Sequence, residues 1–220
     1  MNMSKEDLAQ VYTDIETKTY VRSDKTKKLN EFIERLKAEN IALTFSEVSF
    51  IINKFIIENV TIRHSFFREV IYPSLKTSVE QDNIDAIKLL IKLFHYYGNF
   101  LNLVDDKEYN AAKLINKGLA IEPYDTELLS LYEKRQEDYF EYTLHELPAG
   151  VLYGTDGATI EQCNKLLEEL AHYEDVCKKL SLDREELIEQ CKLYYTLYRS
   201  YLSVYKDYNG FADYLDKHDV

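Results

Sequence analysis

Residues that interrupt regular structure are scarce: the 220-residue chain has three prolines and six glycines. Between nearly all of them, apolar residues recur at helical spacing. We find no stretch of alternating apolar and polar residues that would mark a strand. The sequence therefore predicts an all-α protein of about eight to ten helices, built as a helical-hairpin array, a divergent solenoid or a bundle.

Long apolar runs are missing too. The two longest, Phe50–Ile57 and Leu89–Phe94, are interrupted by polar residues and fall short of the ~20 residues needed to span a bilayer. The first eight residues are polar and charged, so we expect no signal peptide. These features predict a cytoplasmic protein with no membrane-spanning segment.

Cysteine is sparse. Cys163, Cys177 and Cys191 cannot all pair within one chain, and no Cys-x-x-Cys motif occurs. Each lies in a helical pattern at a spacing typical of core positions. We therefore expect reduced thiols that serve as packing residues.

Acidic residues outnumber basic ones, and the excess is local. Residues 1–90 carry 13 basic and 14 acidic side chains, whereas residues 91–220 carry 14 and 25. Such a field repels nucleic acid and anionic membranes and favours a cationic partner. A solvated face that keeps the protein soluble is the alternative interpretation.

Residues 94–123 have the order of large, small and helix-ending residues expected of two helices packed as a hairpin. They read Phe94-x-x-Tyr97-Gly98-x-x-Leu101, then Ala111-x-x-x-Ile115, then Gly118 and Pro123. This spacing resembles one tetratricopeptide repeat over about residues 90–123. The resemblance implies a helical hairpin and, in the family, a peptide-binding groove.

The stretch departs from the pattern of that family. One extra residue lies between its helices, Gly118 stands where alanine is common, and the helix after Pro123 is too long for a standard repeat. A repeat array needs about three units, and we find one. We therefore expect residues 1–220 to form one helical domain, with 1–82 and 83–220 as an alternative subdivision.

Local signals predict several element boundaries. Pro73 should kink or stop the helix that contains it, because proline lacks the N–H donor and clashes with the preceding turn. A third helix is expected over about residues 46–59. Side chains able to cap a helix start stand at five places: Ser4, Ser23 or Asp24, Asn83, Asp125 and Thr159.

The most regular pattern lies in the last long helix, predicted over about residues 183–208. Tyrosine dominates this heptad seam, and its hydroxyl needs a partner when the ring is buried. The seam either receives a neighbouring helix or binds a partner protein, for which we take Tyr194, Tyr198, Tyr201 and Tyr205 as candidates. The seam comprises Leu187, Cys191, Tyr194, Tyr198, Tyr201, Tyr205 and Tyr208.

Two further places are candidates for partner contacts. Glu137, Asp138 and Glu141 lie close together on one predicted helix, a pattern that also fits a solvated face. Three of the six glycines fall in residues 147–158, which form a connector or a partner-contacting loop with Tyr153 and Asp156 as candidates. The Gly-Lys-Ser/Thr ending of a phosphate-binding loop is absent there.

No catalytic motif is recognisable. The five histidines are scattered, and Glu141 with His145 shares one helical face but offers too few ligands for a metal. No glycine-flanked serine and no Cys/His signature occurs. We therefore predict a protein that is not an enzyme and holds no cofactor or metal.

The acidic region suggests the function. Residues 122–189 carry 18 acidic and 6 basic side chains. We expect an interaction module that binds a basic protein, specifically an acidic inhibitor of the immunity or antitoxin type that covers a basic protein toxin. The alternatives are a regulator that senses a peptide or small molecule in a tyrosine-lined pocket, and a small acidic chaperone for a secreted partner.

Overall fold

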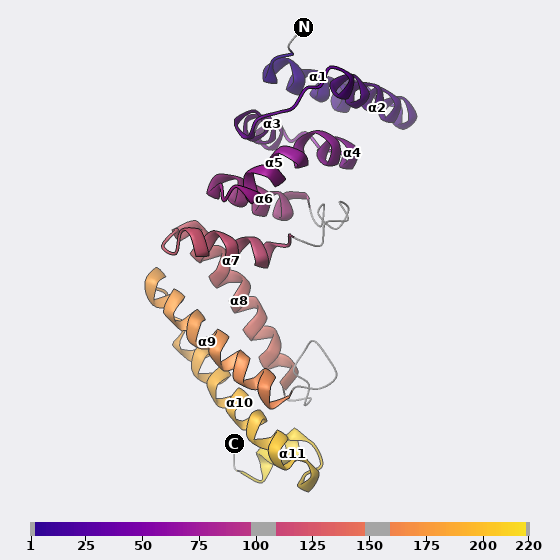
Figure 1. Cartoon of the computed structure of the whole chain (residues 1–220). Coiled ribbons are helices and arrows are strands. Elements are labelled where there is room, and N and C mark those ends of the chain that lie inside the picture. The colour runs from indigo at the N-terminus through magenta and orange to yellow at the C-terminus, as the bar shows by residue number, and fades with distance from the viewer. Residues whose placement is uncertain (1–2, 98–108, 148–158, 219–220) are drawn as a thin grey trace. The chain divides into compact units, whose positions relative to one another are not determined.

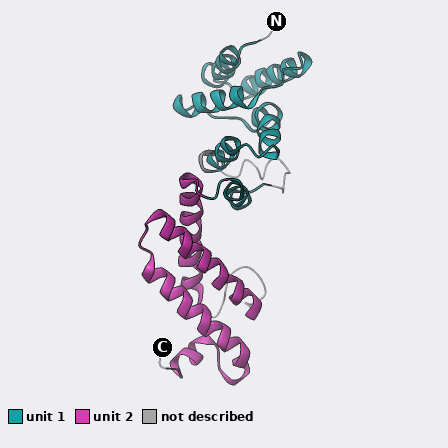
Figure 2. Cartoon of the chain, turned by 60° about the vertical axis from the view of Figure 1, so that its left-hand side comes forward, with its two compact units in different colours: residues 1–123 teal, residues 124–220 magenta. Residues whose placement is uncertain are grey.

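The computed structural model describes residues 3–97, 109–147 and 159–218. These residues form helices and connections with no strand, which confirms the all-α prediction (Figure 1). Contacts divide the chain into two compact units, unit 1 over residues 1–123 and unit 2 over residues 124–220 (Figure 2). The single domain, and its alternative subdivision after residue 82, stay predictions.

In unit 1, each helix packs on helices that lie near it in chain order, though not always on the next one. Helix α1 packs on α2 and α3, α3 packs on α5 and α6, and α6 packs on α7. The Tyr12 ring stacks on Phe66 with 4.1 Å between centroids. The elements are α1 (Lys5–Lys18), α2 (Arg22–Ala38), α3 (Phe45–Ile57), α4 (His64–Phe66), the π-helical turn η1 (Phe67–Ile71), α5 (Tyr72–Glu80), α6 (Ile84–Tyr97) and α7 (Ala111–Ile121).

Unit 2 is built on three long helices that pack on one another. A four-residue turn joins α9 to α10, and Phe140, Tyr173 and Tyr195 lie in the core that they share with α8. The last long helix was predicted to reach Tyr208, but it ends at Val204 and continues as a 3₁₀ turn. The elements are α8 (Thr126–Glu146), α9 (Ile160–Leu180), α10 (Glu185–Val204), η4 (Tyr205–Asp207) and α11 (Phe211–Asp216).

Most predicted helix starts are confirmed. The side chains of Ser4, Asn83, Asp125 and Thr159 each accept a hydrogen bond from a backbone N–H in the first turn of the helix that follows. The prediction for Ser23 or Asp24 is wrong, because α2 begins at Arg22 and has no side-chain cap.

Helix α3 begins earlier than predicted. The cap is Thr44, and it forms a capping box with Glu47 in which the Glu47 carboxylate accepts from the Thr44 N–H at 2.8 Å. The helix therefore starts at Phe45, one residue before the predicted start.

Four helices end in a left-handed residue other than glycine: Asn40, Asn59, Asp82 and Ser181. The residue that follows each of them donates its N–H to the carbonyl five residues before it. The Leu182 N–H, for example, donates to the Cys177 carbonyl at 2.9 Å. This is the hydrogen bond of the Schellman motif. Asparagine, aspartate and serine thus take the left-handed position at these helix ends that glycine usually occupies.

The helix around Pro73 continues instead of stopping. It runs from α4 through the π-helical turn η1 into α5, where the proline occupies the first turn. The Tyr72 N–H bonds to the Phe67 carbonyl, five residues earlier. Because proline has no N–H and clashes with the preceding turn, the wider π turn accommodates it within a helical segment.

The repeat-like stretch does form a helix pair, in which α6 packs on α7. Ile115 and Gly118 are buried, and Lys117 of α7 forms an ion pair with Asp82, just before α6. Gly98 and Leu101, two of the residues on which the resemblance rests, lie outside the described residues. Within the described part of the chain, no helix is long and apolar enough to cross a membrane.

Candidate functional site: an acidic cleft in unit 2

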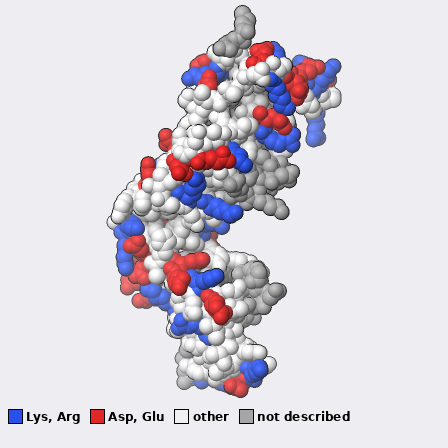
Figure 3. All heavy atoms as spheres, viewed as in Figure 1, with Lys and Arg blue, Asp and Glu red and all other residues white. Residues whose placement is uncertain are grey.

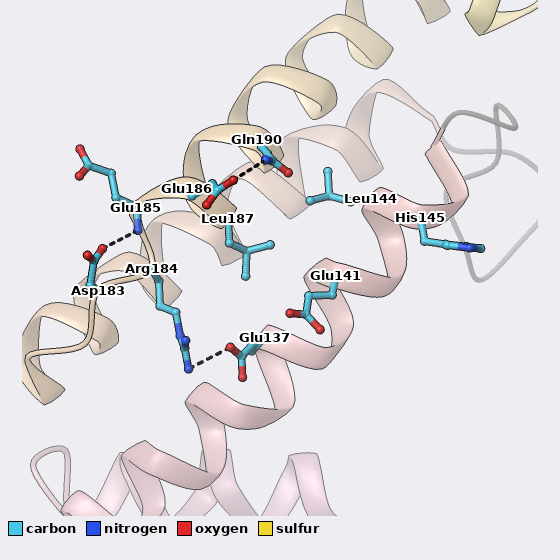
Figure 4. A pocket seen from close by; sticks show the side chains of 10 residues that line it. All are labelled: Glu137, Glu141, Leu144, His145, Asp183, Arg184, Glu185, Glu186, Leu187 and Gln190. Carbon is cyan, nitrogen blue, oxygen red and sulfur yellow. Dashed lines mark hydrogen bonds and ion pairs between the residues drawn. The ribbon is translucent and has the colours of Figure 1, made fainter.

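A cleft of about 690 Å³ lies between the second half of α8 and the start of α10 (Figure 4). We call it the acidic cleft, because five of its ten lining residues are Asp or Glu. Leu144 and Leu187 add apolar surface. The lining consists of Glu137, Glu141, Leu144 and His145 of α8 together with Asp183, Arg184, Glu185, Glu186, Leu187 and Gln190.

Two local features position these residues. On α8, Glu133, Glu137 and Glu141 are four residues apart and so lie along one helical face. On the other side, the left-handed Ser181 ends α9, and the Asp183 carboxylate accepts from the Glu185 N–H at 3.3 Å. This tight turn brings the start of α10 against α8.

Arg184 joins the two walls of the cleft. Its Nε lies 2.9 Å from a Glu133 carboxylate oxygen, and its Nη2 lies 2.9 Å from one of Glu137. Glu133 is 5% exposed and also accepts from the Tyr173 hydroxyl at 3.3 Å. Burial raises the pKa of that tyrosine, so it stays a neutral donor at physiological pH.

The other cleft carboxylates lack cationic partners. Within the described part of the chain, Glu141, Asp183, Glu185 and Glu186 form no ion pair, and Glu186 accepts only a 3.4 Å hydrogen bond from Gln190. Glu137 is compensated by Arg184 and by Lys134 at 3.0 Å. Among the described residues, the cleft therefore holds negative charge that no ion pair compensates.

The contact residues predicted on α8 and in the connector 147–158 fall into three groups. Glu137 and Glu141 line the cleft, as Figure 4 shows. Asp138 does not line it and pairs with Lys134 at 2.9 Å. Tyr153 and Asp156 lie outside the described residues.

The tyrosine seam is mostly internal. Tyr198 is 3% exposed and packs edge-on against Phe211 of α11, with 4.9 Å between ring centroids. Tyr194 and Tyr201 are half-buried against the same core, whereas Tyr205 in η4 is 52% exposed. The seam therefore receives a neighbouring helix, which was one of its two predicted roles.

The histidine beside Glu141 does not complete a metal site. His145 is exposed, lies 3.2 Å from the Glu146 carboxylate, and points away from Glu141 in Figure 4. No group of three or more His, Cys, Asp or Glu side chains in the described ranges could hold a metal ion.

The three cysteines are buried, free thiols. Burial raises the pKa of Cys191 to about 11 and also raises the pKa of Cys163 and Cys177. These groups therefore stay protonated at neutral pH, and a protonated thiol is a poor nucleophile.

The chemistry that the acidic cleft offers is the attraction and binding of cationic groups.

Sequence reasoning missed the α10 side of the cleft. Residues 183–186, Asp-Arg-Glu-Glu, were predicted as the start of the last long helix and as part of the acidic region 122–189, but none was among the candidate contact residues. A signal was present, since three acidic residues stand around one arginine beside a helix end. Only packing against α8 shows that this arginine is engaged and its acidic neighbours are not.

Comparison with known proteins gives no relative. No family model, no curated protein and no solved structure matches the chain.

Proposed function

We propose that the chain is a non-enzymatic interaction module whose acidic cleft binds a basic segment of a partner protein. The observation that carries this proposal is the set of four cleft carboxylates, Glu141, Asp183, Glu185 and Glu186, that form no ion pair with any described residue. Such charges cost little while hydrated, and they gain attraction when a cation replaces the water.

The distribution of charge supports the same conclusion. Residues 1–123 carry 17 basic and 18 acidic side chains, whereas residues 124–220 carry 10 and 21. On the face drawn in Figure 3, both signs are interspersed over both units, so the acidic excess is local rather than one uniform surface. An excess of this kind steers a basic partner toward unit 2 and speeds association.

The contacts of Arg184 indicate that a partner would present an arginine to the cleft. It binds Glu133 and Glu137, which are four residues apart on α8. Glu137 and Glu141 repeat that spacing, and Glu141 forms no ion pair within the described ranges. A planar guanidinium can bond two carboxylates at once, which a lysine ammonium does less well.

Among proteins with such a partner, we favour a cytoplasmic inhibitor of the immunity or antitoxin type that covers a basic protein toxin. The regulator alternative predicts a tyrosine-lined pocket, and none of the residues that line the acidic cleft is a tyrosine. A small acidic chaperone for a secreted partner would use the same charges. The two differ in whether the bound partner is folded and inhibited, or unfolded.

Co-purification of the full chain from its native source tests the proposal. We expect a basic protein to be recovered at low salt and lost at high salt. Exchanging Glu141→Gln and Glu186→Gln should weaken its binding by more than about tenfold. The control pair Glu168→Gln and Glu189→Gln removes the same charge from exposed positions outside the cleft. Equal weakening by both pairs, or no basic partner, would refute the proposal.

A further inference from the structure

A second cavity, of about 470 Å³, lies in unit 1 beside the π-helical turn η1. Its volume is in the range of small-ligand sites, about 300–1,000 Å³. Ile41 and Leu43 of the connection between α2 and α3, together with Phe45 at the start of α3, supply an apolar wall. The opposite wall comes from η1 and α5 and carries hydroxyl and amide groups.

This cavity has no free charge. Glu69 is the one charged residue of its lining. The two oxygens of that carboxylate are paired with Arg68 at 2.6 Å and with Lys37 at 3.3 Å. A charged ligand group would lose water here without gaining a free counter-charge, so the cavity selects uncharged ligands.

Main-chain groups on the apolar wall are open. Thr44 already donates its N–H to Glu47, but Ala42 and Leu43 make no hydrogen bond to any residue in the described part of the chain. Neighbouring free amide and carbonyl groups in a non-helical segment can pair with the backbone of an extended peptide.

The opposite wall offers hydrogen-bond acceptors. The hydroxyls of Thr77 and Ser78 donate to helix carbonyls at 3.0 and 2.9 Å, which leaves their lone pairs free to accept. The cavity therefore combines an apolar wall, open main-chain groups and neutral acceptors.

We propose that this cavity binds an extended, uncharged peptide segment. One apolar side chain of about leucine size would enter between Leu43 and α5, and the peptide backbone would pair with residues 42 and 43. The site lies within unit 1, so it does not depend on the acidic cleft.

Titrating the isotope-labelled full chain with acetyl-Gly-Ser-Leu-Ser-Gly-amide, followed by NMR, tests this site. We expect shifts at the amides of residues 41–45, 69–72 and 74–81, and none with the same peptide carrying aspartate in place of leucine. Absence of shifts in these segments, or equal shifts with the aspartate peptide, would overturn the proposal. This comparison of two peptides needs no variant.

A variant pair sharpens the result. Thr77→Trp fills the cavity from an exposed position, and we expect it to weaken binding by more than about tenfold. Glu80→Trp places the same side chain on the exposed part of α5 outside the lining and should bind like the unaltered chain. Undiminished binding to the folded Thr77→Trp variant would contradict the proposed location.

Discussion

The guanidinium of the half-buried Arg184 and the carboxylate of the buried Glu133 form an ion pair, with 2.9 Å between Nε and Oε1, that ties the start of α10 to the middle of α8. The same guanidinium holds Glu137 at the edge of the acidic cleft. One residue therefore stabilises unit 2 and shapes the surface that we propose as its binding site.

Replacing Arg184 by Met should destabilise unit 2 by about 3 kcal/mol, because it leaves Glu133 buried without its cation. Urea unfolding, followed by the near-ultraviolet circular dichroism of the tyrosines, measures the loss. The double variant Glu133→Gln, Arg184→Met should recover part of it, since the neutral amide can still accept from Tyr173. No recovery would contradict the charge-burial explanation.

A second hydrogen bond between α8 and α10 joins the buried hydroxyls of Thr143 and Tyr195. Thr143→Val should cost about 1–3 kcal/mol, because it removes the hydroxyl partner of Tyr195 in the core. The double variant Thr143→Val, Tyr195→Phe should cost less than the sum of the single variants. Strictly additive losses in this cycle would show that the two hydroxyls are not coupled.

Ser181→Gly should stabilise unit 2 by roughly 0.5–1 kcal/mol. Ser181 has φ 56° and ψ 38°, a left-handed conformation that costs most L-residues about 1–2 kcal/mol, and the greater freedom of unfolded glycine offsets part of the gain. The control is Asn40→Gly, at φ 51°. Asparagine tolerates this conformation, so the change in its unfolding midpoint should be smaller.

Glu174 should make stability depend on pH at the acidic end. Its hydrogen bonds to Lys178 and Lys192 lower its pKa from 4.5 to about 2. A lowered folded-state pKa gives a stabilisation that is present above pH 4.5 and is lost as the pH falls through about 2.

Replacing Glu174 by glutamine isolates the contribution of its charge to stability. Glu174→Gln should lower stability at pH 7 by less than about 1 kcal/mol, because these are surface ion pairs. The difference from the unaltered chain should shrink as the pH falls through about 2 in urea titrations. A difference that keeps its full size at the lowest pH would mean that packing, not charge, is responsible.

The features that sequence reasoning located correctly depend on near neighbours. A capping side chain such as Asn83 bonds a backbone N–H three residues away, so the pattern alone predicts it. The start of α2 is different. There Lys25 reaches back to the Glu16 carbonyl of α1 at 2.5 Å and to its carboxylate at 3.4 Å, and this contact accompanies a helix start without a capping side chain.

The acidic cleft could be predicted only in part for the same reason. Glu137 and Glu141 stand out as acids on one helix, but Glu133 and Arg184 are 51 residues apart and no local pattern connects them. Likewise, Tyr198 and Tyr205 are one heptad apart, so the pattern predicts the same burial for both. The end of α10 at Val204 separates them, leaving one in the core and the other on the surface.

The π-helical turn before Pro73 also fixes the length of its segment. A π-helical turn holds one residue more than the α-helical turn it replaces. Deleting one residue from Phe67–Ile71 would therefore return the segment to α-helical spacing and bring the Pro73 ring against the carbonyl of the preceding turn. Phe66 and Phe67, which are 0% and 2% exposed, hold the start of this segment in the core, so the helix cannot easily shift away from the clash. Insertions and deletions among natural variants of this chain should therefore avoid η1 and collect in the connections between helices.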